Sequence, residues 1–153
     1  MQTETWNSVA NEVDFNLKID TLEFTHHVPK DAAILDYGCG YGRTCEILRL
    51  NDYSDVLGVD SSQEMINRGN LQYQNLSLQQ NQDIKLQYPD GYFDAVVLCA
   101  VLTCIPEQQE KIDVLAEIER LLKPGGILHM VEFCNEENNI FKSKFGVIMH
   151  HQT

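Results

Sequence analysis

The stretch Ile34–Arg43, which reads I-L-D-Y-G-C-G-Y-G-R, decides the fold of this chain. An apolar run leads to Asp36, three glycines alternate over residues 38–42, and Arg43–Leu50 has helical character. This order predicts a buried strand, a tight turn and the start of a helix. Glycines suit the turn because they adopt positive φ and let a ligand approach without a Cβ in the way. The unpaired N–H groups at the helix start then predict a nucleotide-type cofactor site.

Strands and helices alternate along the rest of the chain, which predicts a parallel sheet built from right-handed crossovers. The expected fold is therefore an α/β, Rossmann-like, doubly wound sheet that is mostly parallel. Ser61 or Ser62 caps the second helix, and the last helix opens at Pro106 and stops at K-P-G-G. That last helix is expected to bury the periodic residues Ile112, Leu115, Ile118 and Leu122. Five strands are expected, at 32–37, 56–60, 76–78, 93–99 and 127–133.

Three segments follow from this pattern: an N-terminal segment at 1–31, the cofactor-binding core at 32–134, and a C-terminal extension at 135–153. Thr5–Phe24 has the pattern of a loose amphipathic helix, with Leu17 and Leu22 on its apolar side. Because it precedes the first strand, it is expected either to pack on the sheet or to cover the cofactor pocket. Trp6 and Phe15 are read as core packing or as ligand contacts.

Composition limits the class of protein. The chain has 153 residues, a net charge of −12 and a pI near 4.6, so no basic stripe predicts a nucleic-acid partner. The polar N-terminus predicts no signal peptide, and the longest apolar run, 95–102, is too short to cross a membrane. Five cysteines without a C-x-x-C pair indicate reduced thiols in a cytoplasmic protein, and neither disulfides nor a metal site.

Two features bear on which cofactor binds. Asp60 ends the second strand, at the sheet edge where open α/β folds bind ligands. A carboxylate there accepts ribose hydroxyl protons, which serves NAD and S-adenosylmethionine equally. The glycine spacing separates them: a dinucleotide fingerprint is G-x-G-x-x-G, and its third glycine position is Arg43 here. An NAD-type oxidoreductase is therefore the weaker alternative.

At this point the chain resembles the class I S-adenosylmethionine-dependent methyltransferases. The resemblance runs from Ile34 to about Phe133 and begins with I-L-D-Y-G-C-G-Y-G-R. V-L-G-V-D-S-S-Q-E-M-I is similar to the second motif of that family. L-Q-Y-P-D-G-Y-F-D-A-V-V and L-L-K-P-G-G-I-L look like the later motifs. Four motifs in order imply the family's cofactor, S-adenosyl-L-methionine.

The resemblance implies which residues contact the methionine end of the cofactor. Gly38, Cys39 and Gly40 are expected against the methionine and ribose portion. Asp36 is expected to orient the loop and to face the ammonium group, directly or through water. Cys99 and Ala100, just past the fourth strand, are expected to line the methionine side.

The resemblance also implies an adenosine end. Asp60 is expected to hold the ribose diol, with Ser61 and Met65 flanking the adenine. Asp83 or its neighbour Gln82 is expected to meet the adenine amino group. The spacing before the next motif is one residue short of the common one, so both positions stay open.

The reaction implied is in-line methyl transfer to a small-molecule acceptor. After the fourth strand the chain lacks the Asn-Pro-Pro-Tyr type sequence of the amide- and base-methylating branch, so nucleic acid is not the expected acceptor. A general base is needed only if the acceptor must lose a proton. The alternative is a domain that binds the cofactor and is catalytically incomplete. The candidate bases left open are Tyr41, Thr103, Cys104, Glu132, His150 and His151.

The C-terminus departs from the family pattern. Members usually add a helix and an antiparallel hairpin after the fifth strand, whereas 20 residues follow Phe133 here. Either the chain is a fragment, or something else covers the apolar edge strand. The expected cover is a second copy, which makes a homodimer, or residues 140–149 folded back on the edge.

Overall fold

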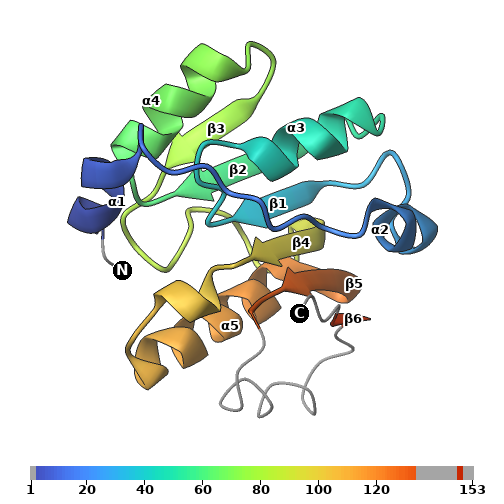
Figure 1. Cartoon of the computed structure of the whole chain (residues 1–153). Helices are drawn as coiled ribbons and strands as arrows, with labels where there is room; N and C mark the ends of the chain where they lie inside the picture. The colour runs from blue at the N-terminus through green and yellow to red at the C-terminus, as the bar shows by residue number, and fades with distance from the viewer. Residues whose placement is uncertain (1–2, 134–147, 150–153) are drawn as a thin grey trace.

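The strands of the computed structural model form one six-stranded sheet (Figure 1), and the structure describes residues 3–133 and 148–149. The spatial order is β3-β2-β1-β4-β5-β6, and every pair of described neighbours is parallel. The predicted Rossmann-like, doubly wound fold is confirmed. The strands are β1 (Ile34–Tyr37), β2 (Val56–Asp60), β3 (Ser77–Gln80), β4 (Phe93–Cys99), β5 (Leu122–Val131) and β6 (Ile148–Met149).

Helices connect the strands on both faces of the sheet, as a parallel sheet requires. The glycine turn leads from β1 into α3, and Ser62 caps α4 by accepting a hydrogen bond from the Met65 N–H at 3.2 Å. The helices are α1 (Thr3–Val9), α2 (Thr21–His27), α3 (Arg43–Leu50), α4 (Gln63–Gln72) and α5 (Gln108–Leu121), with a short 3-10 helix, η1 (Leu102–Cys104).

Two apolar cores sandwich the centre of the sheet. Leu35 and Val96 pack toward α5, whereas Ile34 and Val97 pack toward α2 and α3. Alternate side chains of a strand point to opposite faces, so β1 and β4 supply both cores. All four of these side chains have no exposed surface. This double burial explains why the β4 sequence is a continuous apolar run.

The prediction of one amphipathic helix over Thr5–Phe24 is wrong. Two short helices flank an extended segment, because Asp20 starts a new helix by accepting the Glu23 N–H at 3.0 Å. Leu17 is buried as predicted, but it lies in the extended segment. Leu22 is 83% exposed, contrary to the prediction.

The predicted apolar face of α5 needs one correction. Ile112 is 47% exposed, and the helix buries Val114, Leu115, Ile118 and Leu121 against the sheet. The stripe is therefore rotated from the predicted one, although both have helical spacing. The helix ends at Leu121, so the predicted stop is correct, and β5 starts directly after it.

The outer edge of β5 is paired at two residues. His129 lies opposite Ile148, and Met130 lies opposite Met149, in parallel register. This pairing agrees with the fold-back alternative at these two positions, while residues 140–147 lie outside the described residues. Pairing with a second copy stays a prediction.

Within residues 3–133 and 148–149, no helix has the length and apolar character needed to cross a membrane.

Candidate cofactor site

The glycine turn after β1 is fixed by bonds to the end of β2. The N–H groups of Gly38 and Cys39 donate to the Val59 carbonyl at 2.8 and 2.9 Å. Gly38 has φ +77°, and a Cβ on it would lie 2.6 Å from a methyl group of Val101. A side chain here would thus be strained and would clash, so glycine is required. The turn consequently brings the end of β1 close to the segment that follows β4.

Asp60 links the glycine turn to the start of α4. Its Oδ2 accepts the Gly40 N–H at 2.8 Å, and its Oδ1 accepts the Ser62 N–H at 2.9 Å. Burial raises the pKa of the Asp60 carboxyl above its usual value, and these backbone hydrogen bonds partly oppose that rise. A carboxylate offers about four lone-pair sites, so acceptor capacity remains for a ligand.

Asp36 is the second carboxyl of the site and lies in β1. It is 1% exposed, and its Oδ2 accepts a hydrogen bond from the Cys45 thiol at 3.3 Å. Burial, helped by the nearby Asp60, raises the pKa of Asp36 to about 7, although Cys45 and Arg43 act in the opposite direction. Asp36 therefore gains or loses its proton near neutral pH, which makes it sensitive to a cationic ligand.

A cavity of about 290 Å³ opens at the carboxyl ends of these strands. The strand order reverses beside β1, which is the switch point where open α/β sheets bind ligands. Most of the predicted site residues meet in its wall. Those that line it are Asp36, Gly38, Cys39, Gly40, Asp60, Ser61, Met65 and Cys99.

Gln82 and Asp83 are the predicted residues that the structure leaves outside the cavity wall. Both are exposed, in the loop between β3 and β4. The Asn81 N–H of this loop donates to the Asp60 carbonyl at 2.9 Å, and its side chain bonds the Asp83 carbonyl. The side chains of Gln82 and Asp83 do not line the cavity, and their contact with an adenine stays a prediction.

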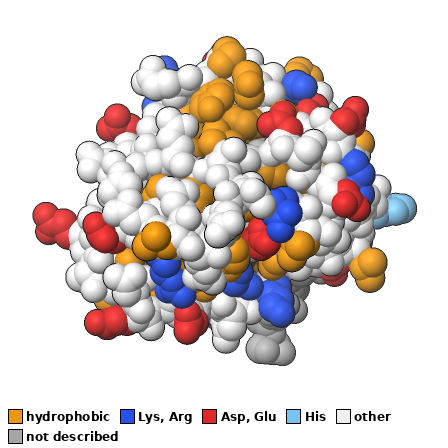
Figure 2. All heavy atoms as spheres, turned by 90° about the horizontal axis from the view of Figure 1, so that it is seen from above, with side chains coloured by type: hydrophobic (Ala, Val, Ile, Leu, Met, Phe, Trp, Pro, Cys, Tyr) orange, Lys and Arg blue, Asp and Glu red, His pale blue; other side chains and the backbone are white. Residues whose placement is uncertain are grey.

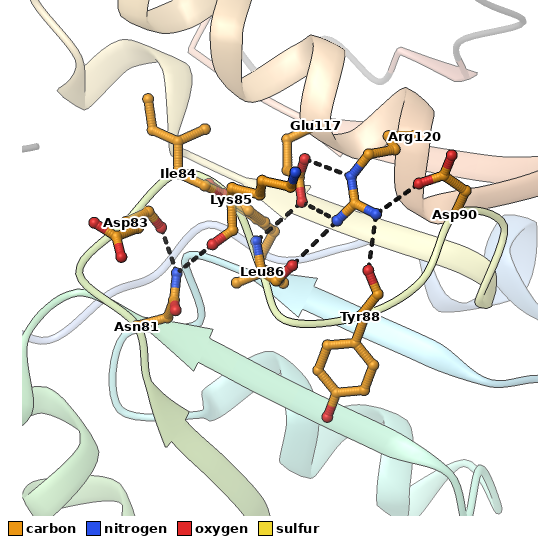
Figure 3. Close-up of polar contacts among 10 residues, drawn as sticks. Asn81, Asp83, Ile84, Lys85, Leu86, Tyr88, Asp90, Glu117 and Arg120 are labelled. Atoms are coloured by element: carbon orange, nitrogen blue, oxygen red, sulfur yellow. Dashed lines mark hydrogen bonds and ion pairs between the residues drawn. The ribbon is translucent and has the colours of Figure 1, made fainter.

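An ion-pair network on α5 fixes the same loop (Figure 3). Arg120 contacts Glu117 at 2.5 Å and Asp90 at 2.9 Å, and it donates to the Leu86 and Tyr88 carbonyls. Glu117 accepts the Leu86 N–H at 3.0 Å. Burial opposes the ionisation of Glu117, but Arg120 and the Leu86 N–H outweigh it and lower the pKa of that carboxyl. This arrangement holds the backbone of 86–90 against α5.

The N-terminal segment contributes cavity residues that the sequence left undecided. Trp6 and Phe15 both line the cavity, so they are more than core packing. Leu17 and Phe24 of the same segment pack in the core against the sheet, and the action of the segment as a cover over the pocket stays a prediction. The signal in the sequence for these two lining residues, Trp6 and Phe15, was their aromatic character, in a polar segment before the first strand. Ala100, expected beside Cys99, and Cys104, one of the candidate bases, also line the cavity. Sequence reasoning missed further lining residues, which are Asp14, Asn16, Leu17, Arg43, Thr44, Val101, Ile105 and Phe133.

Glu132, one of the candidate bases, has a structural role. Its carboxylate accepts the N–H groups of Val101 and Leu102 at 2.8 Å each, and that of Thr103 at 3.2 Å. Burial nevertheless raises the pKa of Glu132. These bonds position the segment after β4, where Ala100 has φ +54°. Glu132 thereby fixes the backbone beside Ala100 and Val101, which line the cavity.

The other candidate bases differ in position. Cys104 lines the cavity, and its thiol donates to the Ala100 carbonyl at 3.2 Å. The Tyr41 hydroxyl accepts the Phe15 N–H at 3.2 Å, and Tyr41 is not among the lining residues. His150 and His151 lie outside the described residues.

Comparison with known proteins agrees with this geometry. A family model described as "Methyltransferase domain" matches residues 35–130. Human Methyltransferase-like protein 27 is 32% identical over 116 residues, which are 74% of this chain and 46% of that protein. Demethylmenaquinone methyltransferase of Bacillus licheniformis is 29% identical over 78% of this chain and 52% of its own length. Arsenite methyltransferase of Aquipseudomonas alcaligenes is 34% identical over 63% of this chain and 31% of its own length. The chain thus spans about half, or less, of these relatives' length.

Solved structures share the fold. A crystal structure of a SAM-dependent methyltransferase from Methanosarcina mazei superposes with a TM-score of 0.70 and 27% identity, covering 82% of this chain and 61% of that one. Phosphoethanolamine N-methyltransferase 1 of Haemonchus contortus, in complex with phosphoethanolamine and S-adenosylhomocysteine, superposes with a TM-score of 0.69 and 21% identity. That match covers 89% of this chain and 34% of the other, and at this identity it supports the fold alone.

Proposed function

This chain belongs to the methyltransferase-domain family, and from that premise we propose that it transfers a methyl group from S-adenosylmethionine to a small-molecule acceptor. The observation that carries the proposal is the pairing of the glycine turn with Asp60 at the cavity. Asp60 already bonds the turn through Gly40 and retains acceptor capacity for the two hydroxyls of a ribose.

The charge of the cavity wall supports this cofactor over a dinucleotide. Two buried or half-buried carboxyl residues, Asp36 and Asp60, line it against the single arginine Arg43, while the third, Asp14, is exposed and paired with Arg68. A net acidic wall favours a ligand that carries a sulfonium and an ammonium group. It disfavours the pyrophosphate of NAD, which needs a positive environment. We therefore assign Asp36 to the ammonium end and Asp60 to the ribose.

In this proposal the chain acts mainly by alignment. S-adenosylmethionine, when bound, supplies a methyl group on a positively charged sulfur. Gly38 and Gly40 let the cofactor lie against the backbone, while Cys99 and Val101 wall the methionine side. Holding acceptor and cofactor in line is the main contribution, since the departing thioether needs no proton. A base is required only for acceptors that must be deprotonated.

The small-molecule acceptor is supported by charge and by the relatives' names. On the face drawn in Figure 2, Lys and Arg side chains are interspersed with Asp and Glu. With a net charge of −12, this surface is a poor match for a nucleic-acid backbone. Two relatives are named for demethylmenaquinone and arsenite, both small molecules. We propose an acceptor of this size class.

Calorimetric titration with S-adenosylmethionine, S-adenosylhomocysteine and NAD tests the proposal. We expect micromolar binding of the first two and weakening of more than about tenfold in Asp60→Ala, because charge-assisted hydrogen bonds are lost. Asp55→Ala, at an exposed carboxylate outside the cavity, is the matched control. Binding of NAD alone, or of none of the three by the folded chain, would contradict the assignment. Binding without methyl transfer would favour the catalytically incomplete alternative.

A further inference from the structure

A strap, defined as residues 10–17, runs from α1 toward α2 (Figure 1), and its second half forms one wall of the cavity. Asp14, Phe15, Asn16 and Leu17 all line the cavity. The strap has no regular helix or strand. Its first residues turn back on α1 through the Glu12 and Val13 N–H groups, which donate to the Val9 carbonyl at 2.8 and 3.1 Å, and the position of the rest depends mainly on side-chain contacts. The Phe15 ring also stands over the glycine turn, because a Cβ on Gly40 would lie 3.0 Å from it.

One arginine of α4 holds most of this strap. Arg68 donates to the Ala10 carbonyl at 2.9 Å and to the Val13 carbonyl at 2.5 Å, and it contacts the Asp14 carboxylate at 2.7 Å. Asp14 is 87% exposed, so that ion pair alone would contribute little. The hydrogen bonds from Arg68 to the Ala10 and Val13 carbonyls fix the backbone of the strap, and they break when the strap moves away from α4.

The same arginine joins a stack that reaches the cavity. The Arg68 guanidinium lies 3.8 Å from the centre of the Tyr41 ring, and the Phe15 ring stacks on Tyr41 at 5.5 Å with an angle of 10°. Trp6 meets Phe15 edge-on at 6.1 Å. The Tyr41 hydroxyl also accepts the Phe15 N–H. Arg68 does not line the cavity, so it acts on the site only through these contacts.

We propose that Arg68 is a positioning residue that latches the strap over the cofactor cavity and limits the rate at which the cofactor enters and leaves. Arg43 bonds the Leu17 carbonyl and anchors the far end of the strap. Releasing Arg68 loosens residues 10–14, while the Arg43 anchor persists and Phe15 keeps its contacts with Tyr41 and Trp6. The latch is a property of the arginine fork, which bonds two carbonyls and stacks on a ring at once. This inference rests on the proposed function.

The test compares Arg68→Met and Arg68→Lys with Arg49→Met. Arg49 is the matched control because its ion pair to Glu46 is local to α3 and away from the strap. Trp6, the only tryptophan, lines the cavity, so its fluorescence reports binding of S-adenosylhomocysteine in stopped-flow mixing. We expect both the association and the dissociation rate to rise by about tenfold in Arg68→Met, and less in Arg68→Lys. A merely structural role would lower the association rate or leave it unchanged.

A second measurement needs no ligand. Hydrogen exchange of the peptide covering 10–17 should be faster in ligand-free Arg68→Met than in wild type or Arg49→Met. Unchanged exchange and unchanged rates would overturn the latch. If wild type fails to bind S-adenosylhomocysteine while exchange responds as expected, the proposed function fails, and with it the control of cofactor exchange; only the hold of Arg68 on the strap stands. If Arg68→Met does not fold, Tyr41→Phe replaces it, because this variant removes the acceptor for the Phe15 N–H. It should raise the two rates and the hydrogen exchange of residues 10–17 by a smaller amount. Rates and exchange equal to those of wild type would overturn the latch.

Discussion

Asp36→Asn should change how the stability of this protein depends on pH. Burial raises the pKa of Asp36 from 3.8 to about 7, so the folded state holds its proton more tightly than the unfolded state. The stability that this proton contributes is fully present below about pH 4 and is lost as pH rises through about 7. At 1.36 kcal/mol per unit, the loss is about 4 kcal/mol.

Asparagine carries no charge at any of these pH values, so the variant should escape this loss. Urea unfolding of wild type and Asp36→Asn at several pH values from about 4.5 to 8 measures the difference in the free energy of unfolding. As pH rises across that range, we expect the free energy of unfolding of the variant to increase relative to that of wild type by several kcal/mol. The Cys45 thiol contact favours the ionised carboxylate, so its effect on the pH dependence is already contained in the pKa of about 7.

Asp55→Asn is the control for this series, since Asp55 is exposed and its substitution should leave the pH dependence unchanged. Parallel curves for wild type and Asp36→Asn would refute the reasoning. They would mean that Asp36 titrates at the same pH in the folded and unfolded states, and that its burial has no electrostatic consequence.

Two further substitutions test the wall of the cavity. Glu132→Ala should lower the free energy of unfolding by about 3 kcal/mol or more, since the N–H groups of residues 101–103 lose their buried acceptor. A shift in the urea midpoint measures this, and wild-type stability in the variant would exclude the role. Gly38→Ala should weaken S-adenosylhomocysteine binding by more than about tenfold, because its Cβ would meet Val101. Gly125→Ala is the matched control: its φ of +78° carries the same strain, but nothing lies within 4 Å of the new Cβ, and equal binding losses in both variants would contradict the steric argument.

The centre of the fold could be predicted from the sequence because its elements obey local rules. The strand Phe93–Cys99 and the helix Arg43–Leu50 were predicted with the bounds that the structure has. A strand buried on both faces is uniformly apolar, and a glycine turn requires residues of one kind. Most of the candidate site follows from these elements, since the ends of parallel strands meet at one edge.

The remaining differences arise where tertiary contacts decide. The apolar residues Val9, Val13 and Leu17 recur at helical spacing, but the chain leaves the helix after Val9. Arg68, which lies more than fifty residues later, bonds the Ala10 and Val13 carbonyls of the non-helical segment, and no local pattern indicates this contact. The side chains of Gln82 and Asp83 are exposed and outside the cavity wall, and Arg120 holds the residues that follow them against α5. Their contact with an adenine stays a prediction. Ile112 has the period of the buried stripe, and only the docking angle of α5 leaves it exposed.

The strand order also has a consequence for how the chain folds. β1 pairs on one side with β2, which follows it closely, and on the other with β4, where Ile34 meets Ala95 about 60 residues later. Local pairs close at small entropic cost, so we expect the β1–β2–β3 half to assemble first and β4 to join late. The cavity needs both halves, because its wall includes the ends of β1, β2 and β4. A nascent chain released only as far as β3 would expose the apolar edge of β1 and have no ligand to shield it, which makes this the stage most prone to aggregation.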